Sequence, residues 1–284
     1  MSVLISVAEL AEALSSDNAP LVLDVRWSLA VPDGRPAYAV EHLPGAIYVD
    51  LNTDLAAPPS GSEGRHPLPT QGGFERAARA WGLTDGEAVV VYDDASGMAA
   101  ARAWWLLRHA GVCDVKILDG GLAAWREAHA PLESGEIHPI VSEIELSWDN
   151  LPVIDADAAG DFSNGGLLLD ARAGERYRGE SEPIDARAGH IPGAVSAPTQ
   201  GNLVEGGTFL AADALRSRFA ALGVDGSRQV AVYCGSGVTA AHEIAALSEA
   251  GIDAALYPGS WSQWSDDEER RVATGAEPDD GLVR

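Results

Sequence analysis

The stretch Gln229–Ala241, with the sequence QVAVYCGSGVTAA, decides the fold. Its apolar run Val230–Tyr233 predicts a buried strand that ends at Cys234, and a helical pattern begins at Val238. The two glycines on either side of Ser236 favour a tight loop between that strand and that helix. Strand, glycine loop and helix in this order are typical of α/β proteins, in which parallel strands alternate with helices.

Cys234 occupies a position at which a thiol becomes reactive. The start of a helix supplies unpaired backbone N–H groups and the positive end of the helix dipole. Both favour the thiolate over the thiol, and the thiolate is the nucleophilic form. A buried, inert cysteine is the alternative, but such a residue does not need glycines and a serine wrapped around it. We therefore interpret Cys234 as a nucleophile.

Length, composition and charge limit the kinds of protein that this chain can be. Its 284 residues are 46% hydrophobic and 22% charged, which suits two domains or one large one. No apolar run approaches the roughly 20 residues of a membrane span, and the N-terminus does not resemble a signal peptide. A net charge of −24 disfavours partners such as nucleic acid and anionic membranes. Because Cys113 and Cys234 form no C-x-x-C pair, we expect a cytoplasmic protein in which Cys113 is structural.

The chain contains the same sequence pattern twice. LVLDVR at residues 21–26 recurs as LLLDAR at 167–172, and HLPGA at 42–46 recurs as HIPGA at 190–194. The order of these motifs is kept, which indicates a tandem duplication. Each half alternates apolar strands with amphipathic helices, so we expect two α/β domains, each a parallel sheet flanked by helices on both faces.

The repeat also suggests domain boundaries. We place the first domain at residues 1–132, a linker rich in Gly, Pro, Ser and acidic residues at 133–152, and the second domain at 153–284. The acidic tail after Trp264 is expected to be loosely held. Asp93 stands opposite Cys234 in the repeat, so the first half lacks the nucleophile.

A strand followed by Cys-Gly-Ser-Gly-Val-Thr and a helix, in the second of two repeats with the H-[IL]-P-G-A box, resembles the rhodanese-like sulfurtransferases. The match is to the two-domain group of thiosulfate and 3-mercaptopyruvate sulfurtransferases and covers nearly the whole chain. The resemblance implies that Cys234 takes a sulfane sulfur from a small anionic donor, becomes a persulfide and passes the sulfur to cyanide or a thiol. Thioredoxin is one candidate acceptor, and no metal or organic cofactor is implied. Backbone N–H groups of the loop would surround the sulfur, and the residues concerned are Gly235, Gly237, Val238 and Thr239.

The loop sequence bears on the donor. Relatives that prefer thiosulfate carry basic residues inside this loop, whereas its Gly-Ser-Gly sequence resembles the mercaptopyruvate pattern, so we favour 3-mercaptopyruvate and keep thiosulfate as the alternative. The resemblance implies that Ser236 assists proton transfer, and capping of the following helix is its other possible role. His66 stands where mercaptopyruvate relatives have a histidine that can pass a proton to the departing enolate, with an ordinary loop histidine as the alternative. Asn52 stands where those relatives have an aspartate that orients the histidine.

Four of the 19 basic residues lie between positions 172 and 187 of this acidic chain. A donor carboxylate favours such neighbours. Arg176 matches a substrate arginine of the family. A second family arginine follows a Pro-Glu-Pro run, and we assign Arg187 to it with Arg178 in reserve. Arg172 is interpreted as structural, as are the histidines of the two H-[IL]-P-G-A boxes, His42 and His190.

Two other classes compete with a sulfurtransferase. Cysteine phosphatases use the motif C-x5-R, in which the arginine holds the phosphate. Ala240 occupies the arginine position here, which argues against that class. A non-catalytic rhodanese-like binding module is the second alternative. The first half of the chain is an example of such a loss, because Asp93 replaces the cysteine there.

Overall fold

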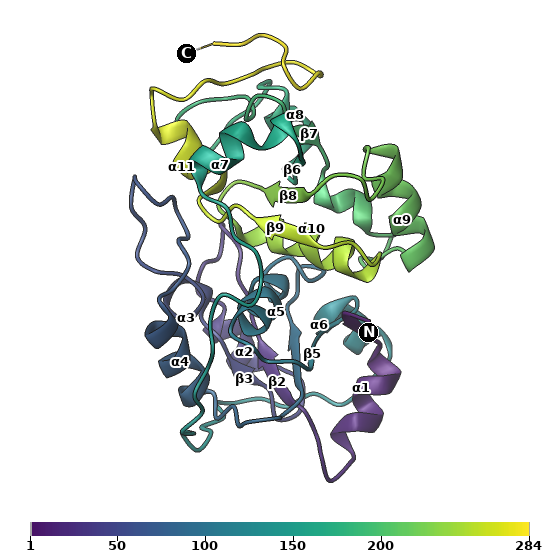
Figure 1. Ribbon diagram of the computed structural model, residues 1–284. Coiled ribbons are helices and arrows are strands. Elements are labelled where there is room, and N and C mark those ends of the chain that lie inside the picture. Colours follow the sequence, from purple (N-terminus) through teal and green to yellow (C-terminus); the bar gives the residue numbers. More distant parts are fainter. Residues whose placement is uncertain (1, 284) are drawn as a thin grey trace. The chain divides into compact units, whose positions relative to one another are not determined.

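The computed structural model describes residues 2–283, which group into two compact units. Unit 1 comprises Met1–Ala57, Leu68–Leu151 and Glu205–Thr208. Unit 2 comprises Pro58–Pro67, Pro152–Val204 and Phe209–Arg284 (Figure 1). Two short segments therefore pack with the half to which they do not belong in sequence. Nearly all of the predicted linker groups with unit 1, and the boundaries drawn from the repeat stay a prediction.

Unit 1 is built on a five-stranded parallel sheet with the strand order β1-β5-β4-β2-β3. Helices α1 and α6 pack on one face, where Leu10 and Trp125 join the core. Helix α5 packs against β4 and β5. The strands are β1 (Leu4–Ile5), β2 (Leu21–Asp24), β3 (Ile47–Tyr48), β4 (Val89–Tyr92) and β5 (Val115–Leu118). The helices are α1 (Val7–Leu14), α2 (Arg35–Val40), α3 (Leu51–Asp54), α4 (Gln71–Ala80), α5 (Ala100–His109) and α6 (Gly121–Glu127).

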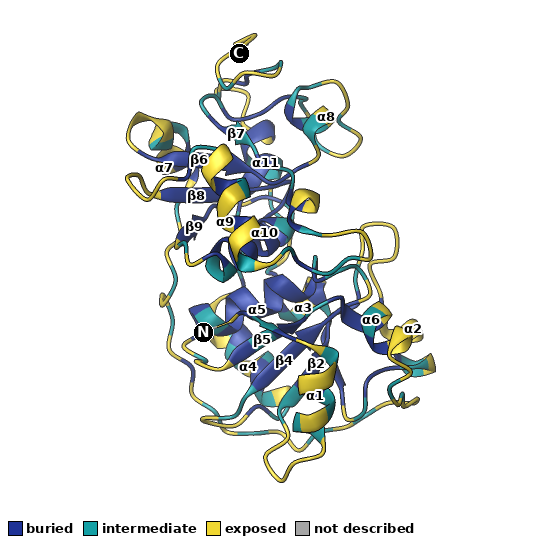
Figure 2. Cartoon of the chain, turned by 90° about the vertical axis from the view of Figure 1, so that its right-hand side faces the viewer, coloured by how far each residue is buried: buried dark blue, intermediate teal, exposed yellow. Residues whose placement is uncertain are grey.

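Unit 2 repeats this plan with the parallel strand order β7-β6-β8-β9. Alternate residues of its central strands point to opposite faces, and all residues of β6 and β8 are buried (Figure 2). Helices α7 and α11 cover one face through Ala159, Trp261 and Trp264, and α10 packs against β8 and β9. The prediction of two parallel sheets flanked by helices is confirmed. The elements are α7 (Ala156–Asp161), η1 (Phe162–Asn164), β6 (Leu167–Asp170), α8 (Gly174–Tyr177), β7 (Val195–Ser196), η2 (Thr199–Asn202), α9 (Ala212–Ala221), β8 (Val230–Tyr233), α10 (Val238–Glu249), β9 (Ala254–Leu256) and α11 (Ser260–Asp266).

The duplicated D-x-R motif forms the same buried ion pair in each unit. Arg26 Nη2 lies 2.6 Å from Asp24 Oδ2, and Arg172 Nη2 lies 2.6 Å from Asp170 Oδ2. Arg172 also donates to the carbonyl of Gly189 at 2.6 Å, and its side chain is only 1% exposed. The structural interpretation of Arg172 is confirmed, because its guanidinium ties the end of β6 to the turn before His190.

The two H-[IL]-P-G-A histidines make matching contacts through their rings and their Nδ1 atoms. His42 stacks on Tyr38 with ring centroids 4.2 Å apart, and its Nδ1 lies 2.9 Å from the Tyr38 carbonyl. His190 stacks on Tyr177 at 3.7 Å, and its Nδ1 lies 2.8 Å from the Tyr177 carbonyl. Both rings are fully buried. The prediction that these histidines are structural is confirmed.

Part of the tail after Trp264 packs on the second of these turns. His190 and Ala273 exchange backbone hydrogen bonds of 2.8 and 2.9 Å, and Val272 pairs with Val283 in the same way. Val272 and Ala273 are buried. The prediction of a loosely held tail is therefore wrong for this segment, because two apolar residues in an otherwise polar stretch anchor it to the core.

A buried polar cluster lies along α10. Asn202 Nδ2 donates to Glu243 Oε2 at 2.7 Å, and Arg218 Nη1 lies 3.4 Å from Oε1. Burial raises the pKa of Glu243 from 4.5 to about 7, although Arg218 and the hydrogen bonds from Asn202 and Thr199 oppose that shift. The fold therefore accommodates the protonated carboxyl better than the carboxylate.

This shift makes stability depend on pH. Between 4.5 and about 7, folded Glu243 keeps a proton that the unfolded chain has released. The free energy of unfolding should therefore fall as pH rises through this window, by up to about 3 kcal/mol. Glu243→Gln should remove that slope, whereas Glu249→Gln, at the partly exposed end of the same helix, should keep it. Urea unfolding across this pH range measures the difference, and a Glu243→Gln slope equal to that of the unsubstituted protein would contradict the prediction.

Candidate functional site

Cys234 directly follows β8, and its sulfur faces the start of α10. The residue is buried, with 1% of its surface exposed. The N–H of Gly237 donates to Cys234 Sγ at 3.1 Å. Gly237 precedes α10 with φ of 76°, a left-handed conformation that side chains rarely adopt. A Cβ there would lie 2.5 Å from the carbonyl oxygen of Pro258, so only glycine brings this N–H to the sulfur without strain.

The first turn of α11 holds the loop from the other side. Ser260 Oγ accepts from the N–H of Cys234 at 3.1 Å, and Trp261 N donates to the Cys234 carbonyl at 3.0 Å. Ser262 N donates to the carbonyl of Gly235 at 2.8 Å. The loop carbonyls are thus bonded to α11. Val238 and Thr239 form the first turn of α10, where backbone N–H groups have no partner within the helix.

The corresponding loop of unit 1 surrounds a carboxyl group with backbone N–H donors. Asp93 follows β4 as Cys234 follows β8, and its carboxylate is fully buried. It accepts hydrogen bonds of 2.7–3.0 Å from four backbone N–H groups, those of Ala95, Gly97, Ala99 and Ala100. Burial raises the pKa of Asp93 above its ordinary value, although the hydrogen bonds from these four donors oppose that shift. The loop architecture therefore directs several backbone N–H groups at the nucleophile position of the repeat.

Ser236 and His66 meet beside Cys234. His66 Nδ1 lies 2.8 Å from Ser236 Oγ, and each residue is 6% exposed. Pro58–Pro67 belongs to unit 2, which explains how a residue from the first half of the chain reaches this loop. No side chain caps α10, because the residue at its N-cap is Gly237. Ser236 therefore bonds to His66 in place of the alternative capping role.

Asn52, which was aligned with an orienting aspartate, lies on α3 in unit 1. Its side chain accepts from Trp27 Nε1 at 3.2 Å and donates to the carbonyl of Pro32 at 3.3 Å. The neighbouring carboxylate of Asp50 caps α3 by accepting from Asn52 N and Thr53 N. These polar groups stabilise the α3 region.

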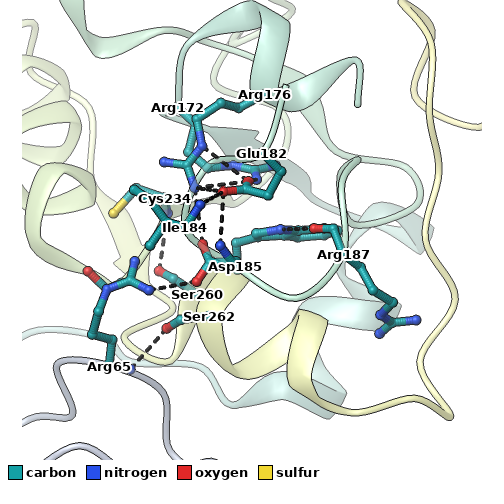
Figure 3. Close-up of polar contacts among 12 residues, drawn as sticks. Arg65, Arg172, Arg176, Glu182, Ile184, Asp185, Arg187, Cys234, Ser260 and Ser262 are labelled. Carbon is teal, nitrogen blue, oxygen red and sulfur yellow. Dashed lines mark hydrogen bonds and ion pairs between the residues drawn. The ribbon is translucent and has the colours of Figure 1, made fainter. Parts of the chain in front are cut away.

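Arg176 lies next to the cysteine loop (Figure 3). Its Nη1 would be 3.5 Å from a Cβ on Gly235. Its Nε and Nη2 are held by Glu182 at 2.7–3.1 Å, and Nη2 also bonds to Asp185 at 3.0 Å. Burial opposes ionisation of Glu182, but Arg176 and backbone N–H groups keep its pKa below the ordinary value. The guanidinium is therefore fixed by carboxylates on one edge and presents Nη1 to the loop.

Arg187 is a different case, and the structure corrects its assignment as a substrate residue. Its guanidinium points away from Cys234 (Figure 3) and donates to backbone carbonyls in the last turn of α11 and in the residues that follow it. The bonds measure 2.6–3.0 Å, and the acceptors are the carbonyls of Trp264, Ser265, Asp267 and Arg270. A helix end leaves its last carbonyls unpaired, and Arg187 satisfies them. Arg178, the reserve, pairs with Glu180 on the surface.

The position of Arg187 predicts an effect on stability. Arg187→Met should lower the free energy of unfolding by about 2–3 kcal/mol, because partly buried carbonyls would lose their donors. Arg178→Met loses one exposed ion pair and should have a much smaller effect on the free energy of unfolding. Urea unfolding of both variants measures the difference, and equal effects of the two substitutions would show that Arg187 does not fasten this helix end.

Arg65 lies in the same cluster, although the sequence did not single it out. Its Nη1 pairs with Asp185 Oδ1 at 2.6 Å, and its Nη2 would lie 3.4 Å from a Cβ on Gly235. The available signal was an arginine directly before His66 in a strongly acidic chain. Because Arg65 is far in sequence from residues 172–187, no sequence pattern grouped it with those arginines.

Other site types find no support in residues 2–283. Within this range no group of three or more His, Cys, Asp and Glu side chains could hold a metal ion. No described helix combines the length and the hydrophobicity needed to cross a membrane. Cys113 is exposed in the turn before β5, outside the core.

The comparisons with known proteins agree with this geometry. A family model described as "Rhodanese-like domain" matches residues 6–128 and 155–267. A Mycobacterium tuberculosis protein provisionally named thiosulfate sulfurtransferase SseB is 45% identical over 278 residues, covering 96% of this chain and 97% of its own. A Pseudomonas aeruginosa protein provisionally named 3-mercaptopyruvate sulfurtransferase is 46% identical over 282 residues, covering 96% and 98%. SseA from Escherichia coli, solved as a 3-mercaptopyruvate sulfotransferase, superposes with a TM-score of 0.81 at 31% identity and covers 92% of this chain and 100% of its own. The resemblance to two-domain rhodanese-like sulfurtransferases is confirmed.

Proposed function

This chain belongs to the rhodanese-like family of sulfurtransferases, and on that premise we propose that it takes sulfur from 3-mercaptopyruvate through a persulfide on Cys234. The observation that carries this choice of donor is the hydrogen bond of 2.8 Å between Ser236 Oγ and His66 Nδ1. It supplies a proton path beside the nucleophile, and of the two candidate donors only mercaptopyruvate needs one.

In the proposed first step the Cys234 thiolate attacks the sulfur of mercaptopyruvate. An S–S bond forms, the C–S bond breaks, and its electron pair leaves with the carbon as the enolate of pyruvate. The enolate then takes a proton, which Ser236 can deliver and His66 can replace. The persulfide that remains carries a negative charge, which the N–H of Gly237 beside it can stabilise.

In the second step the acceptor attacks the outer sulfur of the persulfide. Cyanide becomes thiocyanate, a thiol becomes a new persulfide, and Cys234 leaves as the thiolate. Thioredoxin as a physiological acceptor and a cytoplasmic location stay predictions from the sequence.

Thiosulfate is the second candidate donor, and the positive charges of Arg176 and Arg65 are compatible with it as well. Their guanidiniums lie beside Gly235, where a sulfonate needs positive charge. Attack on thiosulfate releases sulfite, which departs without a proton. Turnover of mercaptopyruvate should therefore depend on the pair formed by Ser236 and His66, whereas turnover of thiosulfate should not.

The test follows from this difference. Initial rates with each donor, and with cyanide as the acceptor, should favour mercaptopyruvate in the unsubstituted protein. Ser236→Ala and His66→Asn should lower kcat for mercaptopyruvate by about 10²-fold and leave thiosulfate turnover nearly unchanged. Equal losses with both donors would overturn the proton-path argument. A preference for thiosulfate would replace the proposed donor, and no turnover with either donor would support the non-catalytic binding module.

A further inference from the structure

We propose that Arg65 is the second guanidinium that binds the donor's carboxylate, together with Arg176. The inference rests on the proposed function and adds a binding residue from a segment far away in sequence. It fills the place that Arg187 was expected to fill. The residue that follows Glu182 and Pro183 here is Ile184, so the local sequence supplies no second cation beside the loop.

The segment Pro58–Pro67 is firmly attached to unit 2. Ser60 and Gly64 exchange backbone hydrogen bonds of 3.1 and 2.8 Å, which closes a tight turn just before Arg65. The N–H of Arg65 donates to Ser262 Oγ at 3.0 Å, and Ser262 N donates to the carbonyl of Gly235 at 2.8 Å. Ser262 therefore connects the backbone of Arg65 to the cysteine loop.

Asp185 fixes the two guanidiniums relative to each other. Its Oδ1 lies 2.6 Å from Arg65 Nη1, and its Oδ2 lies 3.0 Å from Arg176 Nη2 (Figure 3). The Asp185 side chain is 4% exposed, whereas those of Arg65 and Arg176 are 24% and 17% exposed. A buried carboxylate thus orients two arginines that still reach solvent, as a binding site for a small solute requires.

Both arginines retain N–H groups on the side of the loop. Arg65 Nη2 and Arg176 Nη1 would lie 3.4 and 3.5 Å from a Cβ on Gly235, and neither is the atom bonded to Asp185. Arg65 Nε is buried and has no hydrogen-bond partner within residues 2–283. A buried donor without an acceptor is costly, and an oxygen of a bound anion would remove that cost.

These donors suit a carboxylate attached to the reacting carbon chain. The N–H groups of two guanidiniums can donate hydrogen bonds to the two oxygens of one planar carboxylate. Gly235 is the neighbour of Cys234, so an anion over Gly235 places the rest of a small 2-oxo acid thiol near the sulfur. The absence of a side chain at Gly235 keeps this space open.

The test compares Arg65→Met with Arg178→Met, which removes an exposed arginine of the same unit. Arg65→Met should raise KM for mercaptopyruvate by about 10- to 100-fold and change kcat by less than about threefold. Arg178→Met should leave both unchanged. Arg65→Lys keeps the positive charge but not the planar guanidinium, so its KM should lie between those of Arg65→Met and Arg178→Met. This variant also allows the test if Arg65→Met is unstable.

A second measurement separates this inference from the proposed function. Pyruvate, which carries the same carboxylate, can be titrated calorimetrically into Cys234→Ser protein with and without Arg65→Met, where no chemistry occurs. We expect the Kd for pyruvate to rise by about 10-fold or more without Arg65. An unchanged Kd and KM would overturn the role of Arg65 even if mercaptopyruvate is the donor. If mercaptopyruvate is not turned over but pyruvate binding depends on Arg65, the role of Arg65 in binding a 2-oxo acid carboxylate survives and the choice of donor fails.

Discussion

Cys234→Ser should abolish sulfur transfer to cyanide, lowering kcat by at least about 10³-fold with either donor. A serine hydroxyl is far less acidic than a thiol and cannot carry the sulfur as a persulfide. The fold should be unaffected, because a serine oxygen can accept the hydrogen bond that Gly237 N donates to Cys234 Sγ. Thermal unfolding of the variant should match that of the unsubstituted protein.

Cys113→Ser is the matched control for this substitution. Cys113 is the other cysteine of the chain, and it is exposed in a turn of unit 1. Its replacement should leave kcat and KM unchanged within error in the same assay. Activity that survives in Cys234→Ser but disappears in Cys113→Ser would identify Cys113 as the nucleophile and contradict the assignment to Cys234.

Gly237→Ala should reduce both stability and turnover. The left-handed backbone alone costs a non-glycine residue about 1–2 kcal/mol, and the new Cβ would meet the Pro258 carbonyl oxygen at 2.5 Å. Relief of that contact displaces the N–H that donates to Cys234 Sγ at 3.1 Å. Loss of one such donor at a charged centre lowers kcat on the order of 10²-fold. Urea unfolding and initial rates measure the two effects.

Substitutions at two other glycines of unit 2 distinguish the cost of the left-handed backbone from the cost of the contact with Pro258. Gly251 has φ of 79° and open space around it, so Gly251→Ala should incur only the backbone cost and retain activity. At Gly235 a Cβ would make ordinary contacts with Arg65 and Arg176, so Gly235→Ala should fold normally and weaken donor binding. If Gly237→Ala is as stable as Gly251→Ala, the new Cβ does not clash with the Pro258 carbonyl oxygen, and this prediction is wrong.

The sequence predicted those parts of the site that consist of consecutive residues. The strand Val230–Tyr233, Cys234 at its end and the glycine loop all have strong short-range signals, and the structure has them in that order. The duplication predicted the second sheet as well, because Leu21 pairs with Val89 and Leu167 with Val230 in the same register.

The choice between arginines could not be predicted in this way. Arg187 and Arg176 are close in sequence, but Arg187 turns to the open carbonyls at the end of α11, a tertiary contact that no local pattern encodes. Arg65 reaches Asp185 because Pro58–Pro67 packs with unit 2, across 120 positions of the chain. A single sequence carries no signal for such a contact.

Intact-mass spectrometry after incubation with mercaptopyruvate, in the absence of an acceptor, tests the central claim most directly. The unsubstituted protein and Cys113→Ser should each gain the mass of one sulfur atom, and cyanide should remove it. Cys234→Ser should gain nothing. No added sulfur on the unsubstituted protein, or the same gain in Cys234→Ser, would contradict a persulfide on Cys234.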